Sequence, residues 1–246
     1  MAEPAIDSEG GAVMTVVEHL TELRRRIVIS IVAVAIGAVV GFFLAPTAIS
    51  ILKEPLGEAQ PLFFTAPSSA FFLRLKVALM IGLALASPIV LYQLWAFVAP
   101  GLTLRERRAA LPWVPLGLLF LVLGIGLAYF ILPFAVTFML GFAIPGVLLP
   151  LITADAYFGF VTNMFLAFGL VMEFPIVLVL LGKVGIVSAQ RLRRNRRYVF
   201  LGIFVFAVVV TPGGDPYSPT IMGVVMYLLY ELTIRLVARS ERPASD

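Results

Sequence analysis

The feature that most constrains this chain is a series of long apolar stretches with few or no charged residues. The stretch IVISIVAVAIGAVVGFFLA at 27–45 is apolar on every side, whereas a strand of a membrane β-barrel alternates apolar and polar residues. A helix of about 20 such residues spans about 30 Å of hydrocarbon. We therefore predict an all-α polytopic membrane protein with six transmembrane helices, at 27–45, 77–98, 111–133, 157–182, 198–211 and 219–236.

The composition excludes a soluble fold. Hydrophobic residues make up 61% of the chain and charged residues 13%, against about 45–50% and about 25% in an ordinary soluble domain. A soluble domain of this size has too small an interior to cover that much apolar surface, so the net charge of +4 does not indicate a nucleic-acid-binding domain. With no cysteine and one histidine, the sequence predicts no thiolate nucleophile, metal site or cofactor, so any chemistry would have to use carboxylates.

The distribution of Lys and Arg predicts the orientation of the chain in the plasma (inner) membrane. Fifteen of the 18 basic residues fall on one side of the predicted helices, in segments 24–26, 105–108, 183–197 and 235–242. The others are Lys53, Arg74 and Lys76. Cytoplasmic segments are rich in Lys and Arg, so we expect both termini in the cytoplasm. The membrane domain should cover 16–238, between a disordered cytoplasmic tail at 1–15 and a second cytoplasmic tail at 239–246.

The connections on the outer side are long. Residues 46–76 and 134–156 contain Pro, Gly and aromatic residues, and loops of this length rarely lack secondary structure. We expect caps on the outer membrane surface that contain short interfacial helices. The predicted span at 198–211 has only about 14 residues, about 21 Å of helix, so the bilayer should be thin beside it.

Two glutamates on the predicted cytoplasmic side lie beside clusters of arginine. Glu22 lies one helical turn before Arg26, and Glu106 lies between Arg105 and Arg107. The simplest interpretation is that each glutamate forms a salt bridge with arginines that fix the topology. A carboxylate at a membrane surface can also bind the guanidinium of a ligand through two parallel hydrogen bonds. The spacing leaves both interpretations open.

Glu173 lies inside the predicted fourth span, about 15 Å along the helix from Lys183. An acidic side chain at the centre of a bilayer costs at least about 2.5–3.5 kcal/mol on insertion scales. Glu173 should therefore face protein or a water-filled cavity, and Pro175 should kink the helix beside it. The alternative is a protonated side chain that bonds a neighbouring helix.

Other polar residues have simpler interpretations. Asp215 is most simply a turn residue in TPGGDPYSP, and Glu231 is expected to pair with Arg235 one helical turn later. His19 is expected to lie beside the glutamates at the membrane surface. The sequence does not match a nucleophile with its base, a zinc motif or a phosphate-binding glycine loop.

Four segments together resemble the TatC family, the integral receptor subunit of the twin-arginine protein translocase. They are HLTELRRRI, SPIVLYQLWAFVAPGLTLRERR, FGLVMEFP and VTPGGDPYSPTIMGVVMYLLYEL. The resemblance covers His19 to Leu236 and agrees in the number of spans, the orientation and the loop lengths. It implies export of folded proteins driven by the proton-motive force, without covalent chemistry.

The resemblance also implies roles for individual residues. Those of the site for the paired arginines of a signal peptide are Glu22, Glu106, Arg24 and Phe97. The resemblance further implies that the chain binds lipid and other copies of itself, together with TatA-like single-span proteins and, as a second kind of partner, TatB-like ones.

Other positions match family residues away from the arginine site. Pro55 matches the proline of the first outer cap, Glu173 the glutamate on the membrane face where the single-span partners pack, and Asp215 the acidic residue of the last outer turn. Many members carry glutamine four residues after that aspartate, where this chain has Pro219. A polar contact between partner and sixth span is therefore not expected in the same form.

Two other functions compete with this interpretation. A proton- or ion-coupled transporter would use Glu173 as its coupling carboxylate, but the sequence has no matching pair of interrupted helices. A membrane-embedded hydrolase or lipid transferase would need a nucleophile or a histidine-centred site that the sequence does not provide.

Overall fold

The computed structural model describes residues 16–57, 60–101, 107, 113–144, 146–147, 149–183 and 187–241. The long helices are α1 (Val16–Lys53), α2 (Ser69–Val98), α4 (Trp113–Leu140), α5 (Ala154–Met172), α8 (Arg196–Val210) and α9 (Tyr217–Glu241). Shorter ones are α6 (Phe174–Lys183), α7 (Ala189–Arg194), η1 (Glu54–Leu56) and η2 (Ala99–Gly101). An isolated β-bridge joins Phe63 and Thr153, and the described residues form no β-strand. The predicted all-α fold is thus confirmed.

Both predicted tails fall largely on residues outside this description. The predicted N-terminal tail, 1–15, lies outside the described residues, as do residues 242–246 of the predicted C-terminal tail. Helix α9 continues to Glu241, beyond the predicted boundary at 238.

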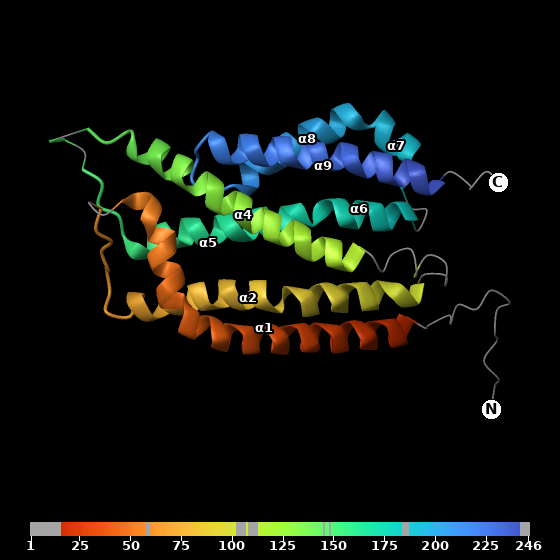
Figure 1. Ribbon diagram of the computed structural model, residues 1–246, viewed down its shortest axis with the longest axis horizontal. Coiled ribbons are helices and arrows are strands. Elements are labelled where there is room, and N and C mark those ends of the chain that lie inside the picture. Colours follow the sequence, from red (N-terminus) through yellow and green to blue (C-terminus); the bar gives the residue numbers. More distant parts are fainter. Residues whose placement is uncertain are drawn as a thin grey trace.

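The long helices form a row along the molecule, in which α4 crosses α5 and α6 obliquely (Figure 1). Helix α1 packs on α2, α2 packs on α4 and α5, and α9 packs on α4, α6 and α8, so α1 and α8 form the two edges of the row. The start of α1 and the end of α9 lie at the same end of the molecule (Figure 1).

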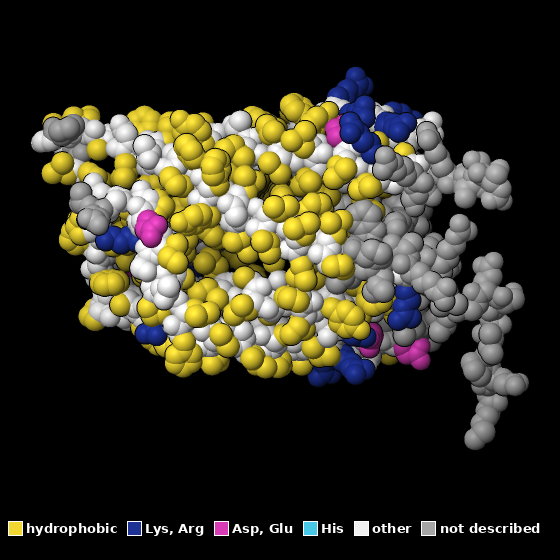
Figure 2. Space-filling view, viewed as in Figure 1, with side chains coloured by type: hydrophobic (Ala, Val, Ile, Leu, Met, Phe, Trp, Pro, Cys, Tyr) yellow, Lys and Arg dark blue, Asp and Glu magenta, His cyan; other side chains and the backbone are white. Residues whose placement is uncertain are grey.

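We call this end the basic end, because most of the described basic residues gather there in two groups (Figure 2). They are Arg24, Arg25, Arg26, Arg107, Arg191, Arg193, Arg194, Arg196, Arg197 and Arg235. Lys53, Arg74 and Lys76 lie towards the opposite end. The predicted separation of basic residues is therefore present among the described residues, while the side of the membrane stays a prediction.

Within the described residues, five helical segments are long and apolar enough to cross a membrane: Val17–Leu56, Ser69–Val98, Pro115–Leu140, Ala154–Val179 and Tyr217–Ala238. The remaining long helix, α8, has 15 residues and a length of about 22 Å, less than the thickness of a typical hydrocarbon core. A sixth crossing by α8 stays a prediction.

Helix α1 continues through Pro46, so the predicted cap at 46–76 begins later than the sequence indicated. A proline within a helix leaves the carbonyl four residues earlier without its N–H donor. Here Arg74 of α2 donates from Nε to the carbonyl oxygen of Phe42 at 3.0 Å, and its guanidinium lies 4.2 Å from the centre of the Phe42 ring. Arg74 thus replaces the missing donor, and α1 bends towards its C-terminal end without stopping (Figure 1).

The second predicted cap, 134–156, is also shortened by a helix. Helix α4 continues through Pro133 to Leu140, so the connection to α5 begins only after that residue. The bridge between Phe63 and Thr153 joins this connection to the one before α2, through the bonds Phe63 N–H to Ile152 and Ala154 N–H to Phe63. The opposite end is therefore closed by two joined loops and the bent end of α1.

Helices α1 and α2 approach each other closely at glycine residues. A Cβ atom placed on Gly82 would lie 2.5 Å from the backbone nitrogen of Ala38, and one placed on Gly41 would lie 2.4 Å from the carbonyl oxygen of Ala78. Small residues let helix backbones approach in this way, which maximises van der Waals contact where lipid provides no hydrophobic driving force.

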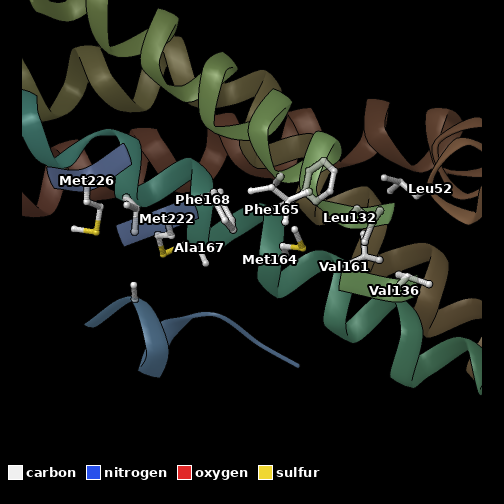
Figure 3. Close-up of a cluster of buried hydrophobic side chains, with 14 of the residues drawn as sticks. Leu52, Leu132, Val136, Val161, Met164, Phe165, Ala167, Phe168, Met222 and Met226 are labelled. Atoms are coloured by element: carbon white, nitrogen blue, oxygen red, sulfur yellow. The ribbon is translucent and has the colours of Figure 1, made fainter. Parts of the chain in front are cut away.

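The centre of the molecule is formed around α5. Its residues Val161, Met164, Phe165 and Phe168 pack against Leu132 and Val136 of α4 and against Met222 and Met226 of α9 (Figure 3). Helix α1, by contrast, exposes most of its large apolar side chains. The edge of the row is therefore an apolar surface suited to lipid.

Candidate functional site

The basic end holds a chain of side-chain contacts between α1 and α2. Arg26 donates to Oε1 of Glu22 from Nε at 2.7 Å and from Nη2 at 2.6 Å. Its Nη1 donates to Oε1 of Gln93 at 2.7 Å, and Gln93 is only 8% exposed. The predicted i,i+4 pair of Glu22 and Arg26 is thus confirmed, and Gln93 holds it against α2.

An aromatic contact lies beside this chain. The rings of His19 and Phe97 stack with their centroids 4.4 Å apart, joining the start of α1 to the last turn of α2. Arg24 is exposed on α1. The structure therefore brings Glu22, Arg24 and Phe97 to one end of two adjacent helices. Glu106, the fourth predicted member of this site, lies outside the described residues.

Sequence reasoning missed Gln93. Its partner, Arg26, lies 67 positions away, so no local spacing connects them. One signal was available: Gln93 is the only amide side chain in the stretch 77–98, and a buried amide needs a hydrogen-bond partner.

Glu173 lies at the break between α5 and α6, where Pro175 was predicted to kink the helix. Its backbone N–H bonds to the carbonyl of Leu170, and its own carbonyl accepts from Ile176. The helix assignment is thus interrupted at Glu173, two residues before Pro175, while the kink stays a prediction.

The Glu173 carboxyl group packs against the neighbouring helices. A Cβ atom placed on Gly117 of α4 would lie 3.1 Å from Oε2 of Glu173 and 3.2 Å from Cδ1 of Leu91 on α2. Oε1 is buried and has no hydrogen-bond partner among the described residues. The described helices therefore do not provide the bond that the alternative interpretation of Glu173 requires.

Asp215 caps the N-terminus of α9. Its Oδ1 accepts from the backbone N–H of Ser218 at 2.7 Å, while Oδ2 is buried without a partner among the described residues. Asp215 is 2% exposed, so it is more than the simple turn residue that the sequence indicated. Pro219 lies within the first turn of α9, where a missing N–H is tolerated. Pro55 lies in η1 at the opposite end.

The predicted pairing of Glu231 is wrong. Its Oε2 accepts from Nη2 of Arg196 at 2.6 Å, and not from Arg235 one turn along the same helix. The reason is the packing of α8 on α9, which places the first residue of α8 beside Glu231, while Arg235 is exposed.

The described residues contain no group of three or more His, Asp or Glu that could hold a metal ion. The polar groups at the basic end are carboxylate, guanidinium and amide, which bind charged ligands through hydrogen bonds and ion pairs. These groups can bind a charged ligand at one end of an apolar helical protein.

These features define a helical integral membrane protein with a charged contact site at its basic end. The family model of the Sec-independent protein translocase protein TatC matches residues 18–224. This chain belongs to the TatC family, and its role is in protein transport across a membrane and not in enzyme catalysis.

Relatives and solved structures of the same family are similar to this chain over most of its length. The Sec-independent protein translocase protein TatC of Carboxydothermus hydrogenoformans is 38% identical over 232 residues, covering 94% of this chain and 95% of the relative. TatC of Aquifex aeolicus is 38% identical over 228 residues, covering 91% and 94%. A crystal structure of the twin arginine translocase receptor TatC in DDM matches with a TM-score of 0.77 and 37% identity, covering 89% of this chain and 99% of that one.

Proposed function

We propose that this chain binds twin-arginine signal peptides at its basic end and that this end faces the cytoplasm. Glu22 and Glu106 would each bind one guanidinium of the arginine pair, with Arg24 and Phe97 beside them. The observation that carries the proposal is that the Glu22 carboxylate already holds a guanidinium, that of Arg26. The similar crystal structure is that of a twin arginine translocase receptor, which agrees with this chemistry.

Arg26 determines which oxygen atom of Glu22 a peptide arginine could bind. Both of its hydrogen bonds to Glu22 end on Oε1, so a peptide guanidinium could bind Oε2 or replace Arg26. Arg26 would keep its bond to Gln93 in either case. Lysine has no planar fork of donors, so it should compete poorly for such a carboxylate.

The rest of the proposal concerns topology and partners. Six crossings, with α5 and α6 together as the fourth and α8 as the fifth, would put both termini in the cytoplasm. TatA-like and TatB-like single-span proteins would pack on the membrane face near Glu173, with further contacts at Asp215 and Pro55, and several copies of the chain would assemble. Export of folded proteins would draw on the proton-motive force.

The test is the affinity of the purified protein for a signal peptide with an Arg-Arg or a Lys-Lys pair. A charge-assisted hydrogen bond contributes about 1.5–3 kcal/mol, so Glu22→Ala and Glu106→Ala should each weaken Arg-Arg binding about ten- to a hundredfold. Glu106→Lys should weaken it further, because repulsion is added to the lost contact. The Lys-Lys peptide should bind wild type poorly and lose little more.

The matched control is Glu54→Ala, which removes an exposed carboxylate at the opposite end and should leave both affinities unchanged. Equal proportional losses for the Arg-Arg and Lys-Lys peptides in the Glu22 and Glu106 variants would mean that these glutamates only hold the local fold. The assignment of the site to them would then be withdrawn.

A further inference from the structure

A second group of arginines at the basic end lies away from the proposed peptide site. The segment SAQRLRRNRRYVF at 188–200 contains five arginines and no acidic residue. It forms α7 and the start of α8, and basic side chains gather there in Figure 2. We call the exposed residues Arg193, Arg194 and Arg197, with Tyr198 beside them, the arginine shelf.

The backbone under the shelf is held in place. The Ser188 hydroxyl accepts from the backbone N–H of Arg191 at 3.2 Å and caps α7. Leu192 is buried, and the hydroxyl of Tyr230 on α9 donates to its carbonyl oxygen at 2.8 Å. The ion pair of Arg196 with Glu231 fixes the first residue of α8. A ligand would therefore meet an ordered surface.

Within the described part of the chain, no carboxylate forms an ion pair with Arg193, Arg194 or Arg197. The guanidinium of Arg197 lies 4.8 Å from the centre of the Tyr198 ring and donates from Nη2 to the Tyr198 hydroxyl at 3.1 Å. Tyr198 is 62% exposed. The shelf thus presents three guanidinium groups that pair with no described carboxylate, and an exposed tyrosine, a residue type that favours the membrane interface.

The shelf lies at the start of α8, a helix shorter than a typical hydrocarbon core. From Tyr217 to Glu231, the partner of Arg196, α9 rises about 21 Å, which is less than a hydrocarbon core of about 30 Å. The outer face of α8 directly beyond the shelf is apolar and exposed: Phe200, Leu201, Phe204, Val205, Val208 and Val209. Lipid covering this face would bring its headgroups against the shelf.

We propose that the arginine shelf binds the phosphate groups of anionic phospholipids in the leaflet at the basic end. Guanidinium matches phosphate through two parallel hydrogen bonds, and basic groups close to a membrane surface attract anionic lipid. The proposal rests on the proposed function only in taking α8 as a crossing helix. Bound lipid would also fill the thin region of bilayer beside α8.

The test uses purified protein in nanodiscs that contain equal amounts of phosphatidylglycerol and phosphatidylcholine. Native mass spectrometry of the released protein counts the two lipids that stay bound. Wild type should retain phosphatidylglycerol in preference, and each of Arg193→Gln, Arg194→Gln and Arg197→Gln should lower that preference about fivefold. A triple variant with lysine in place of Arg193, Arg194 and Arg197 keeps the net charge but loses the planar fork of donors. Its preference for phosphatidylglycerol should fall between that of wild type and those of the glutamine variants.

The matched control is Lys53→Gln with Lys76→Gln, which removes charge at the opposite end and should leave the preference unchanged. Soluble glycerophosphoglycerol should not displace the lipid, because it lacks acyl chains to lie against α8. An unchanged preference for phosphatidylglycerol when all three arginines are replaced by glutamine would overturn the proposal. So would an equal loss of that preference in the control. So would displacement of phosphatidylglycerol by soluble polyglutamate, which would identify an acidic protein as the occupant.

The single glutamine variants keep the test decisive even if a multiple variant does not fold. If the triple glutamine variant is not recovered from membranes, the single variants carry the comparison. Failure of the lipid test leaves peptide binding at Glu22 untouched. Failure of α8 to cross would appear independently, as a cytoplasmic location of Asp215.

Discussion

The Glu173 carboxyl group lies among apolar neighbours, with Oε1 buried and unpaired among the described residues. Alanine at this position removes a polar group that an apolar environment disfavours and breaks no described hydrogen bond. We expect Glu173→Ala to insert and fold as wild type does, while crosslinking to a single-span partner falls. The measurement is the membrane level of the variant together with the yield of that crosslink.

Glu173→Gln serves as the matched variant, since it keeps the size of the side chain and removes its ability to ionise. If the protein disappears from membranes when Glu173 is replaced by alanine, the side chain has a structural role within its own chain. The partner assignment would then lose its support.

Arg74 and Pro46 form a pair whose coupling can be measured. Arg74→Leu leaves the Phe42 carbonyl without a donor and should lower the free energy of unfolding by about 1–3 kcal/mol. Pro46→Ala restores a backbone N–H four residues after Phe42, so in that background Arg74→Leu should cost less than about 1 kcal/mol. Unfolding titrations of the four proteins give the coupling energy. Equal costs in both backgrounds would show that Arg74 does not replace the missing donor.

At the scale of elements, the contact between α1 and α2 depends on the absence of side chains. Gly82→Ala would place a Cβ atom 2.5 Å from the Ala38 nitrogen, and backbone cannot move aside as a flexible side chain can. We expect a loss of about 1–3 kcal/mol in the free energy of unfolding, the usual cost of overpacking. The control is Gly202→Ala on α8, where nothing lies within 4 Å of the added atom.

Helix propensity favours alanine over glycine by up to about 1 kcal/mol, so Gly202→Ala should be neutral or slightly stabilising. If both glycine variants unfold at the same denaturant concentration as wild type, the helices can separate without cost. The close approach of α1 and α2 would then contribute little to stability.

Local patterns in the sequence predicted the elements better than the contacts between them. Apolar length predicted the helices, and i,i+4 spacing predicted the bond of Glu22 with Arg26. The same spacing failed for Glu231, because Arg196 on a neighbouring helix competes for its carboxylate. A bond such as that of Arg26 with Gln93 depends on how two helices pack, and no periodicity within either helix contains that information.

The boundary of the first predicted cap was also changed by a contact between helices. The first predicted span ends at residue 45, directly before Pro46. A proline inside a helix normally costs about 3 kcal/mol. The helix continues because Arg74, 32 positions away from Phe42, supplies the missing donor. Pro46 does remove a backbone hydrogen bond, but the contact with Arg74 lets the helix continue past it.

At the scale of the whole molecule, the row of helices has two different edges. Helix α1 is long and exposes apolar side chains along most of its length, whereas α8 is short and begins in a cluster of arginines. A membrane around this molecule should therefore be thinner beside α8 than beside α1. This difference makes the crossing by α8 the most informative part of the topology to test.

Six crossings predict the location of each connection. Reporter fusions after Ala154 and after Asp215 should report the outside, and fusions after Gln190 should report the cytoplasm. A fusion after Asp215 distinguishes two arrangements of α8 and α9, because about 22 Å of helix can cross only a thinned bilayer. If that fusion reports the cytoplasm while the one after Ala154 reports the outside, α8 and α9 form a re-entrant hairpin and the number of crossings falls to four.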